Sequence, residues 1–318
     1  MEKVLVTEHI HDDAVAYLKE HFEVVQGTST EASEIIRQAQ GCAGILIRSA
    51  KITTEVMDAI PTLKVVAKHG MGVDNIDVAH ATEKGILVVN APYSNMNAVA
   101  EHIVTLLLAL SKRIVRMDKL TRNGGFTQRN TYKTIELKDA TVGIVGMGKI
   151  SRLVVKKLSG FDMHIIASDP FVKQEDVGDL PVTMTSAEEV YSTSDFVVVH
   201  TSLFPSTFHL VSAEQFKMMK PTAYIINAAR GPIIDEAAMI EALKAGEIAG
   251  AGLDVFEQEP PAEDNPLFAM DNVIVSPHNA ALCDGALRAM AMDSAQGITE
   301  YLTGQTVSYP VNREVLEK

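Results

Sequence analysis

Three segments in the second half of the chain carry residues that could act together chemically. Arg230 and His278 each follow an apolar run, and Glu259 lies in a turn rich in proline and acidic residues. A guanidinium can bind a carboxylate or a carbonyl through two hydrogen bonds. A histidine can supply or take the proton that accompanies hydride transfer, and a carboxylate partner favours its charged form. The three residue types therefore suit the reduction of a ketone.

Each of the three residues also has an ordinary structural interpretation. Arg230 could form a surface ion pair, Glu259 could be a solvated loop acid, and His278 could be a capping residue. Ligands of doubly wound sheets bind beyond the carboxyl ends of the strands, where Arg230 and His278 are expected. Their occurrence together, after a nucleotide-binding pattern, favours the chemical interpretation.

That pattern is the stretch T141-V-G-I-V-G-M-G-K-I-S-R152, an apolar run that leads into G-x-G. In a Rossmann unit the first glycine permits a tight turn and the second lets the backbone approach the pyrophosphate. Gly146 and Gly148 suit these roles, and Lys149 and Ile150 would offer backbone N–H groups to the phosphates. Ser151 stands where the third glycine is expected, and it is small enough to preserve the helix packing. Alone, the motif could be an ordinary strand-to-helix turn.

An acidic residue at the end of the next apolar run strengthens the nucleotide interpretation. Asp169 lies about 20 residues beyond the glycines, where a carboxylate should accept hydrogen bonds from the adenosine ribose. A carboxylate there would repel a 2′-phosphate, so NAD is favoured over NADP. The alternative is that Asp169, which precedes Pro170, merely ends a strand.

Alternating strand and helix patterns are expected to position these residues. Such alternation predicts an α/β protein with two Rossmann-like, doubly wound parallel-sheet domains. Long helices are expected from near Asn97 to the break at residues 123–125, and from about Ala286 to Leu302. The predicted domains are residues 1–98 plus 290–318, and residues 99–289. Strands are expected at residues 3–7, 22–26, 44–48, 63–67 and 86–90, and at residues 141–145, 163–167, 195–199, 223–227 and 272–276.

Composition narrows the possible partners. The net charge of −13 and the pI near 5.2 make nucleic acid an unexpected ligand. Cys42 and Cys283 are the only cysteines and lack metal-ligand spacing, so we expect no metal site of that kind. The start of the chain lacks a signal-peptide pattern, and its most apolar helical run is too short to cross a bilayer. We therefore expect a cytoplasmic protein that is not bound to membranes.

The whole chain resembles the D-isomer-specific 2-hydroxyacid dehydrogenases, which use NAD(P). The resemblance is carried by A-A-R-G-P-I-I-D-E at residues 228–236, G-L-D-V-F-E-Q-E-P at residues 252–260 and S-P-H-N-A at residues 276–280. It implies that Arg230 is the catalytic arginine, that His278 is the acid/base histidine and that Glu259 is the acidic partner that orients and charges His278. It also implies a set of residues that line NAD: Ala228, Ala229, Asp254, Asn279, Ala280 and Ala281, with His200 and Thr201 in a loop where Ser202 replaces the usual proline.

The N-terminal part shares the resemblance. K68-H-G-M-G-V-D-N-I-D77 is similar to the family's substrate loop, which implies that backbone N–H groups near Met71, Gly72 and Val73 hold the substrate carboxylate. A turn that caps the next helix is the alternative. L46-I-R-S-A-K-I-T53 is most similar to the phosphoglycerate dehydrogenase branch, where the matching Arg48 reaches the substrate; the alternative is an ion pair at a strand end. His69 stands where that branch often has arginine.

The resemblance implies an NAD-dependent enzyme that acts on 3-phosphoglycerate and 3-phosphohydroxypyruvate. Two alternatives remain: a reductase for hydroxypyruvate, glyoxylate or another 2-keto acid, and a non-catalytic NAD sensor similar to corepressor relatives. Family members are commonly dimers, so a homodimer is expected, with the helices near Ala100–Leu110 contributing to the interface.

Overall fold

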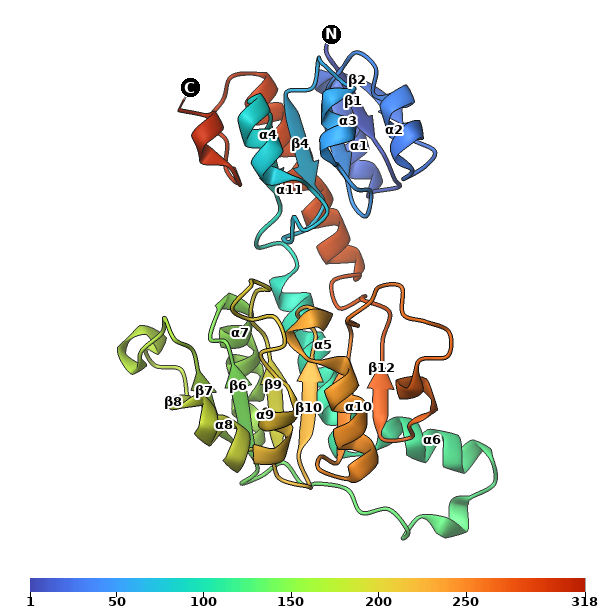
Figure 1. The fold of residues 1–318 in the computed structure, drawn as a ribbon, viewed down its shortest axis with the longest axis vertical. Coiled ribbons are helices and arrows are strands. Elements are labelled where there is room, and N and C mark those ends of the chain that lie inside the picture. The colour runs from blue at the N-terminus through green and yellow to red at the C-terminus, as the bar shows by residue number, and fades with distance from the viewer. Residues whose placement is uncertain (318) are drawn as a thin grey trace. The chain divides into compact units, whose positions relative to one another are not determined.

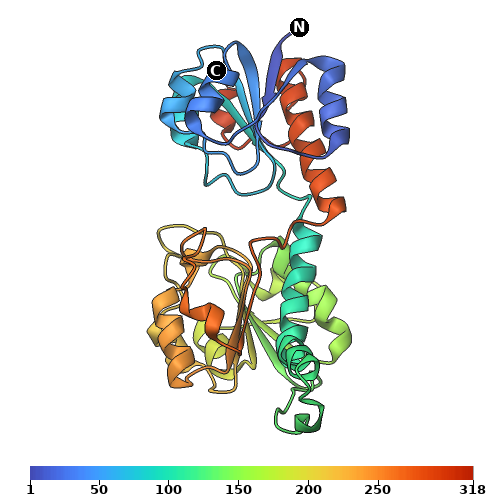
Figure 2. The same cartoon turned by 90° about the vertical axis from the view of Figure 1, so that its right-hand side faces the viewer.

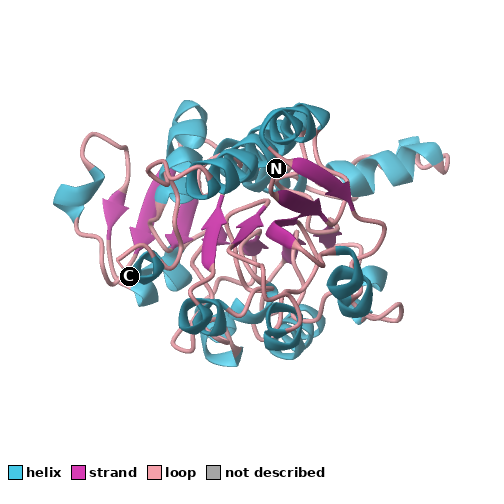
Figure 3. Ribbon diagram, turned by 90° about the horizontal axis from the view of Figure 1, so that it is seen from above, coloured by secondary structure: helices cyan, strands magenta, loops and turns pink. Residues whose placement is uncertain are grey.

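The chain folds around two separate parallel sheets, as seen in a computed structural model that describes residues 1–317 (Figure 1). Unit 1 contains Met1–Asn95 and the chain from Ala281 onward, and unit 2 contains Met96–Ala280. Every strand pair within the two sheets is parallel, with helices on both sides of the strands (Figure 3). The predicted fold class is therefore confirmed.

The sheet of unit 1 has five strands in the order β2-β1-β3-β4-β5. This order reverses between β1 and β3, and such a switch point is where a doubly wound sheet opens a crevice for a ligand. The strands are β1 Lys3–Val6, β2 Glu23–Gln26, β3 Cys42–Ile47, β4 Val65–Lys68 and β5 Leu87–Asn90.

Alternate side chains of these strands enter two apolar cores, one on each face of the sheet. Leu5 and Ile45 lie in one core with α2, α3 and α4, whereas Val4 and Leu46 lie in the other with α1 and α11. Helix α11, which follows the last strand of unit 2 in sequence, packs along β3, β4 and β5 (Figure 2). The helices are α1 Asp12–His21, α2 Ala32–Gln38, α3 Thr54–Asp58, α4 Val78–Lys84 and α11 Asp284–Leu302.

The C-terminal tail completes unit 1. Pro310 pairs with Val89 of β5 in an antiparallel bridge, and the Val311 N–H donates to the Val88 carbonyl at 2.8 Å. The buried Asn312 side chain accepts from the Val88 N–H at 2.7 Å. The tail therefore returns to the first unit, as the sequence suggested.

The sheet of unit 2 has seven strands in the order β12-β11-β10-β9-β6-β7-β8. Its switch point lies between β6 and β9, so the segments that follow these two strands border the expected crevice. The strands are β6 Thr141–Val145, β7 His164–Ser168, β8 Thr183–Met184, β9 Phe196–Val199, β10 Tyr224–Asn227, β11 Gly250–Leu253 and β12 Val273–Val275.

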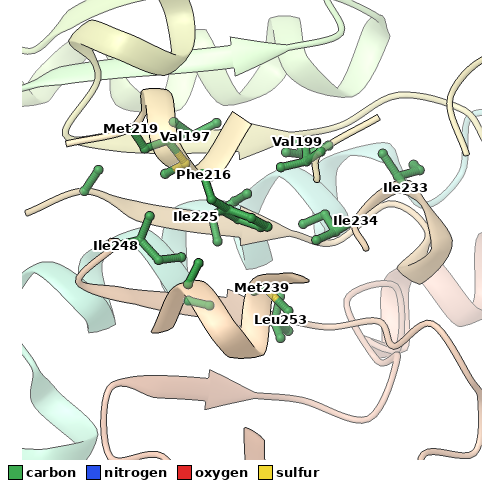
Figure 4. Close-up of a cluster of buried hydrophobic side chains, with 14 of the residues drawn as sticks. Val197, Val199, Phe216, Met219, Ile225, Ile233, Ile234, Met239, Ile248 and Leu253 are labelled. Carbon is green, nitrogen blue, oxygen red and sulfur yellow. The ribbon is translucent and has the colours of Figure 1, made fainter. Parts of the chain in front are cut away.

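Helices cover both faces of this second sheet. On one face, α8, α9 and α10 bury a core that includes Val197, Phe216, Ile225 and Leu253 (Figure 4). On the other face, α5 packs against β10, β11 and α7. The helices are α5 Met96–Ser111, α6 Ile114–Arg122, α7 Lys149–Leu158, α8 Ala187–Thr193, α9 Ala213–Met218 and α10 Glu236–Ala245.

Two strands and one helix break were missing from the expected elements. β8 has only two residues, and β11 has the glycine-rich sequence GAGL, which gives a weak strand signal. At Gly252 a side chain would lie 3.1 Å from Leu110 and 3.3 Å from Leu106, so glycine here lets α5 approach closely. The single long helix expected from Asn97 is wrong, because Arg113 has φ of 49° and separates α5 from α6.

The unit boundaries also differ from the expected ones. In the structure the first stretch of unit 1 ends at residue 95 and unit 2 ends at residue 280, whereas the sequence predicted ends at residues 98 and 289. In the structure both boundaries precede a helix, because α5 lies wholly in unit 2 and α11 wholly in unit 1. None of the helices in the described part of the chain has the length and apolar character needed to cross a membrane.

Candidate functional site

The glycine turn lies at the switch point of unit 2. Gly146 has φ of 94°, and a side chain there would come within 2.5 Å of the His200 carbonyl oxygen. Glycine is thus required both by backbone conformation and by space. Gly148 caps the N-terminus of α7, and a Cβ there would meet nothing within 4 Å. This exposed glycine leaves an open approach to the first N–H groups of α7, at Lys149 and Ile150.

Ser151 has a defined role in this turn. Its buried hydroxyl donates a 2.6 Å hydrogen bond to the Gly146 carbonyl. The hydroxyl thereby links the first turn of α7 to the first glycine. Ser151, which occupies the position of the usual third glycine, stabilises the turn through this hydrogen bond. The substitution is compatible with a phosphate-binding turn.

Asp169 lies directly after β7 and is held beside the glycine turn. One carboxylate oxygen accepts from the Met147 N–H and the other from the Phe171 N–H, each at 2.8 Å. The side chain is partly exposed, and each oxygen can accept a further hydrogen bond. Its position therefore suits the predicted interaction with ribose hydroxyls.

We expect a strong preference for NADH over NADPH. A carboxylate at Asp169 would lie close to a 2′-phosphate, and such like-charge contact costs enough to lower kcat/KM for NADPH by about 10²-fold. The Asp169→Asn variant removes the charge and keeps one acceptor oxygen, so the preference should shrink to about tenfold. Steady-state rates with each cofactor test this, and equal use of NADPH by the unaltered protein would contradict the role of Asp169.

His200 follows β9 and lies against the glycine turn with Thr201. Its Nδ1 atom is one of two buried side-chain polar atoms without a hydrogen-bond partner in the described part of the chain. Burial, with a smaller effect from the nearby Arg230 charge, lowers the pKa of His200 to about 4. A neutral imidazole with an unsatisfied nitrogen at the switch point fits a site that receives a polar ligand.

The low pKa of His200 predicts a pH-dependent stability. The pKa of a histidine in the unfolded chain is near 6.5. Between about pH 6.5 and pH 4 the imidazole is therefore protonated in the unfolded state and neutral in the folded state. Acidification from about pH 7 to about pH 5 should therefore cost the protein about 2 kcal/mol more than it costs the His200→Asn variant. Urea unfolding at both pH values measures the difference. His164→Asn, at an exposed histidine, should behave as the unaltered protein.

Arg230, Glu259 and His278 all belong to unit 2 and follow three neighbouring strands, β10, β11 and β12. The His278 Nδ1 atom lies 2.7 Å from the Glu259 Oε2 atom. Because a carboxylate only accepts, Nδ1 carries the proton in this pair. The other ring nitrogen, Nε2, is then the atom that can exchange a proton with a substrate. The His278 side chain is 49% exposed, so that nitrogen can be reached.

The electrostatics keep the Glu259 carboxyl charged. Burial alone would raise the pKa of Glu259, but the hydrogen bond and charge of His278, the Phe256 N–H and the Arg230 charge outweigh burial and lower it. Arg230 therefore lies close enough to influence both Glu259 and His200. A guanidinium, a carboxylate and an imidazole thus gather at the carboxyl edge of the sheet.

The remaining predicted cofactor residues line the same edge. Ala228 and Ala229, which connect β10 to Arg230 in the sequence, are both buried. Asp254 follows β11, is 1% exposed and accepts hydrogen bonds from the N–H groups of Asn279 and Ala280, each at 2.9 Å. Ala281, also predicted to line the cofactor, is the first residue of the second part of unit 1.

The predicted substrate residues Arg48, Met71, Gly72 and Val73 all lie in unit 1. Arg48 follows β3 at the switch point of the five-stranded sheet. The loop that contains Met71 is held by two hydrogen bonds, from the Asn90 side chain to the Met71 carbonyl at 2.7 Å and from the Ala91 N–H to the Gly70 carbonyl at 3.0 Å.

One residue that positions Arg48 was not predicted from the sequence. Glu8 follows β1, and its Oε2 atom accepts hydrogen bonds from the N–H groups of Arg48, Ser49 and Ala50 at 3.0, 2.7 and 3.1 Å. Glu8 therefore fixes the backbone that carries Arg48. An acidic residue directly after the first strand was the available signal, but nothing local indicated its partner.

Comparisons with known proteins agree with this geometry. A family model described as "D-isomer specific 2-hydroxyacid dehydrogenase, NAD binding domain" matches residues 104–280. A D-3-phosphoglycerate dehydrogenase of Archaeoglobus fulgidus is 38% identical over 99% of this chain and 60% of its own length. A glyoxylate reductase of Thermococcus onnurineus is 37% identical over 99% of this chain and 97% of its own length. The chain spans about three fifths of the first curated relatives it matches.

A solved structure extends the similarity to the fold. An NADPH-dependent glyoxylate/hydroxypyruvate reductase from Sinorhizobium meliloti, in complex with NADP and malonate, superimposes with a TM-score of 0.87 at 28% identity. The match covers 98% of this chain and 97% of that one.

Proposed function

Because the chain belongs to the D-isomer-specific 2-hydroxyacid dehydrogenase family, whose NAD-binding domain it contains, we propose that it interconverts a 2-keto acid and a D-2-hydroxy acid with NAD. The observation that carries the proposal is the hydrogen-bonded pair of His278 and Glu259, with Arg230 nearby, at the edge of a sheet whose glycine turn suits a dinucleotide.

Each of the three residues has a separate task in this proposal. Arg230 binds the substrate carboxylate and its adjacent carbonyl oxygen, since its planar group can hold both. His278 donates the proton from Nε2 to the carbonyl oxygen as that oxygen gains negative charge. Glu259 orients the imidazole by accepting a hydrogen bond from Nδ1, which leaves Nε2 directed to the substrate. Bound NADH would supply the hydride.

The residues of unit 1 bear on the choice of substrate. A phosphate-bearing substrate, 3-phosphohydroxypyruvate, would need cations, and Arg48 at the switch point is a suitable one. Burial lowers the pKa of His69 and so disfavours its charged form, and this effect outweighs the opposing effect of the Leu287 carbonyl oxygen, which lies 3.2 Å from the His69 Nε2 atom. The similarity to a glyoxylate reductase over nearly its whole length favours glyoxylate or hydroxypyruvate as the second candidate.

A panel of 2-keto acids tests the proposed function. NADH oxidation should be followed with 3-phosphohydroxypyruvate, hydroxypyruvate, glyoxylate and pyruvate under the same conditions. Turnover of any of them supports the reaction class, and the highest kcat/KM identifies the substrate group. NADH binding without turnover of any 2-keto acid would overturn the enzyme proposal and favour a non-catalytic NAD sensor.

Replacement of Arg48 should affect the two candidate substrates differently. 3-Phosphohydroxypyruvate and hydroxypyruvate differ only in the phosphate, so Arg48→Gln should lower kcat/KM about 10- to 100-fold for the phosphorylated compound and by less than about threefold for the other. The matched control is Arg37→Gln, an exposed ion-paired arginine of the same unit. Equal losses with both substrates would argue against contact between Arg48 and a phosphate.

We expect the protein to be cytoplasmic and to form a homodimer. Much of α5 between Ala100 and Leu110 is buried within unit 2 itself, which leaves few of its side chains for an interface. Helix α6 has no buried residue, and Ile114 and Val115 are each 55% exposed. A second copy that covers α6 would bury this apolar surface. Light scattering of the purified protein measures the mass, and a monomer would refute the dimer.

A further inference from the structure

A histidine, a serine and an aspartate form a hydrogen-bonded chain behind the residues already described. His102 lies on α5, Ser276 directly follows β12, and Asp254 directly follows β11. The His102 Nε2 atom is 2.9 Å from the Ser276 Oγ atom, which is 2.6 Å from the Asp254 Oδ1 atom. His102 is also 3.5 Å from the same carboxylate oxygen.

The direction of these bonds follows from the proton inventory. The Ser276 hydroxyl has one proton, and the short bond to the carboxylate uses it because a carboxylate cannot donate. The hydroxyl oxygen must then accept from His102, so the Nε2 atom of His102 carries a hydrogen. His102 acts as a donor that fixes the orientation of the serine hydroxyl.

Asp254 in turn holds the segment that contains His278. Its carboxylate accepts from the N–H groups of Asn279 and Ala280, and its carbonyl accepts from the His278 N–H at 2.8 Å. His278 has φ of 51°, a left-handed conformation that a non-glycine residue adopts at an energetic cost. The loop keeps this conformation because Asp254 bonds the strained residue itself and the two residues that follow it.

Helix α5 provides a rigid support for the donor. Ile103 and Leu106, next to His102 along the helix, are buried, and α5 packs against β10, β11 and α7. Without the His102 donor, the Ser276 hydroxyl could rotate toward the Leu253 carbonyl, 3.5 Å away, and Asp254 would lose one of its bonds. The loop conformation would then be less well defined.

We infer that His102 is a positioning residue: through Ser276 and Asp254 it holds the loop that presents His278 to the substrate. The inference rests on the proposed function only for the role of His278 in turnover. The effect of the hydrogen-bonded chain on the loop conformation is separate from turnover, and it can be measured without substrate or cofactor.

Two replacements of His102 distinguish a donor from a space-filling side chain. His102→Leu keeps similar volume without a donor, whereas His102→Gln places an amide N–H near the position of Nε2. His102→Leu should lower kcat about tenfold, the equivalent of one lost hydrogen bond in a charged network, with KM for the keto acid changed less than about threefold. His102→Gln should restore kcat to within about threefold of the unaltered protein.

Amide hydrogen exchange of the cofactor-free protein provides the second readout. The amides of Asn279 and Ala280 should exchange about tenfold faster in His102→Leu and at nearly the normal rate in His102→Gln. Ser276→Ala should act as His102→Leu does, and the double variant should be no worse than Ser276→Ala alone, because both residues act through the same bond.

The outcomes separate this inference from the proposed function. Normal exchange and turnover in His102→Leu, equal damage in His102→Leu and His102→Gln, or additive losses in the double variant would each overturn the positioning role. Absence of turnover in the unaltered protein would overturn the enzyme proposal instead. In that case faster exchange confined to His102→Leu and Ser276→Ala would still support the contact of His102 with the loop, and normal exchange would refute it.

Discussion

Replacement of His278 by glutamine is expected to lower kcat by about 10²-fold or more. Glutamine is similar in reach and can still donate a hydrogen bond, but it cannot transfer a proton near neutral pH. The Glu259 carboxylate would still accept from the amide, so the loop should keep its position. Steady-state reduction of the best 2-keto acid with saturating NADH measures the loss.

Two controls make the result specific to proton transfer. The His164→Gln variant changes an exposed histidine in the same unit and should retain full activity. NADH binding to the His278→Gln variant, followed by fluorescence, should stay within about threefold of the unaltered protein. A turnover close to normal in His278→Gln would eliminate His278 as the general acid, whatever its geometry.

Replacement of Arg230 is expected to have a comparable effect, mainly through the substrate. Arg230→Gln removes the charge and two potential hydrogen bonds to the keto acid, each worth about 1.5–3 kcal/mol, so kcat/KM should fall about 10²- to 10⁴-fold. Arg230→Lys keeps the charge and loses the planar two-bond geometry, so it should recover only part of that loss. The same kinetic assay measures both variants.

The pattern of the losses identifies what Arg230 does. A guanidinium that holds the keto acid should raise KM for that substrate much more than KM for NADH. Arg37→Lys is a suitable control, because Arg37 is exposed on α2 and forms its ion pair with Glu34 of the same helix. Full activity of Arg230→Lys would mean that charge alone is sufficient and would contradict bidentate binding.

The sequence predicted the fold class and the main candidate residues because both leave local signals. Strands buried on two faces appear as short apolar runs, and residues at their carboxyl ends can be read directly from the sequence. Arg230, Glu259 and His278 stand out in this way, as do the glycines at 146 and 148. The pairing of His278 with Glu259 was expected from the family resemblance, and in the structure the two side chains lie 2.7 Å apart.

The elements that the sequence did not predict depend on neighbours far along the chain. The glycines of β11 weaken its strand signal, yet one of them, Gly252, allows Leu106 and Leu110 of α5 to pack closely on the sheet. The helix break at Arg113 could not be predicted from the sequence, because no glycine or proline lies near it. The unit boundary before α11 is explained by the apolar core that Ala295 and Ile298 complete in unit 1.

By itself, the sequence determined a parallel α/β protein with a dinucleotide turn and an arginine, a glutamate and a histidine at strand ends, because local spacing encodes strand ends. Only the tertiary structure decided which distant side chains support them. His102 and Ser276 are 174 positions apart, and Glu8 and Arg48 are 40 apart. Sheet order brings these pairs together, and that order results from the packing of whole elements, which no short stretch of sequence records.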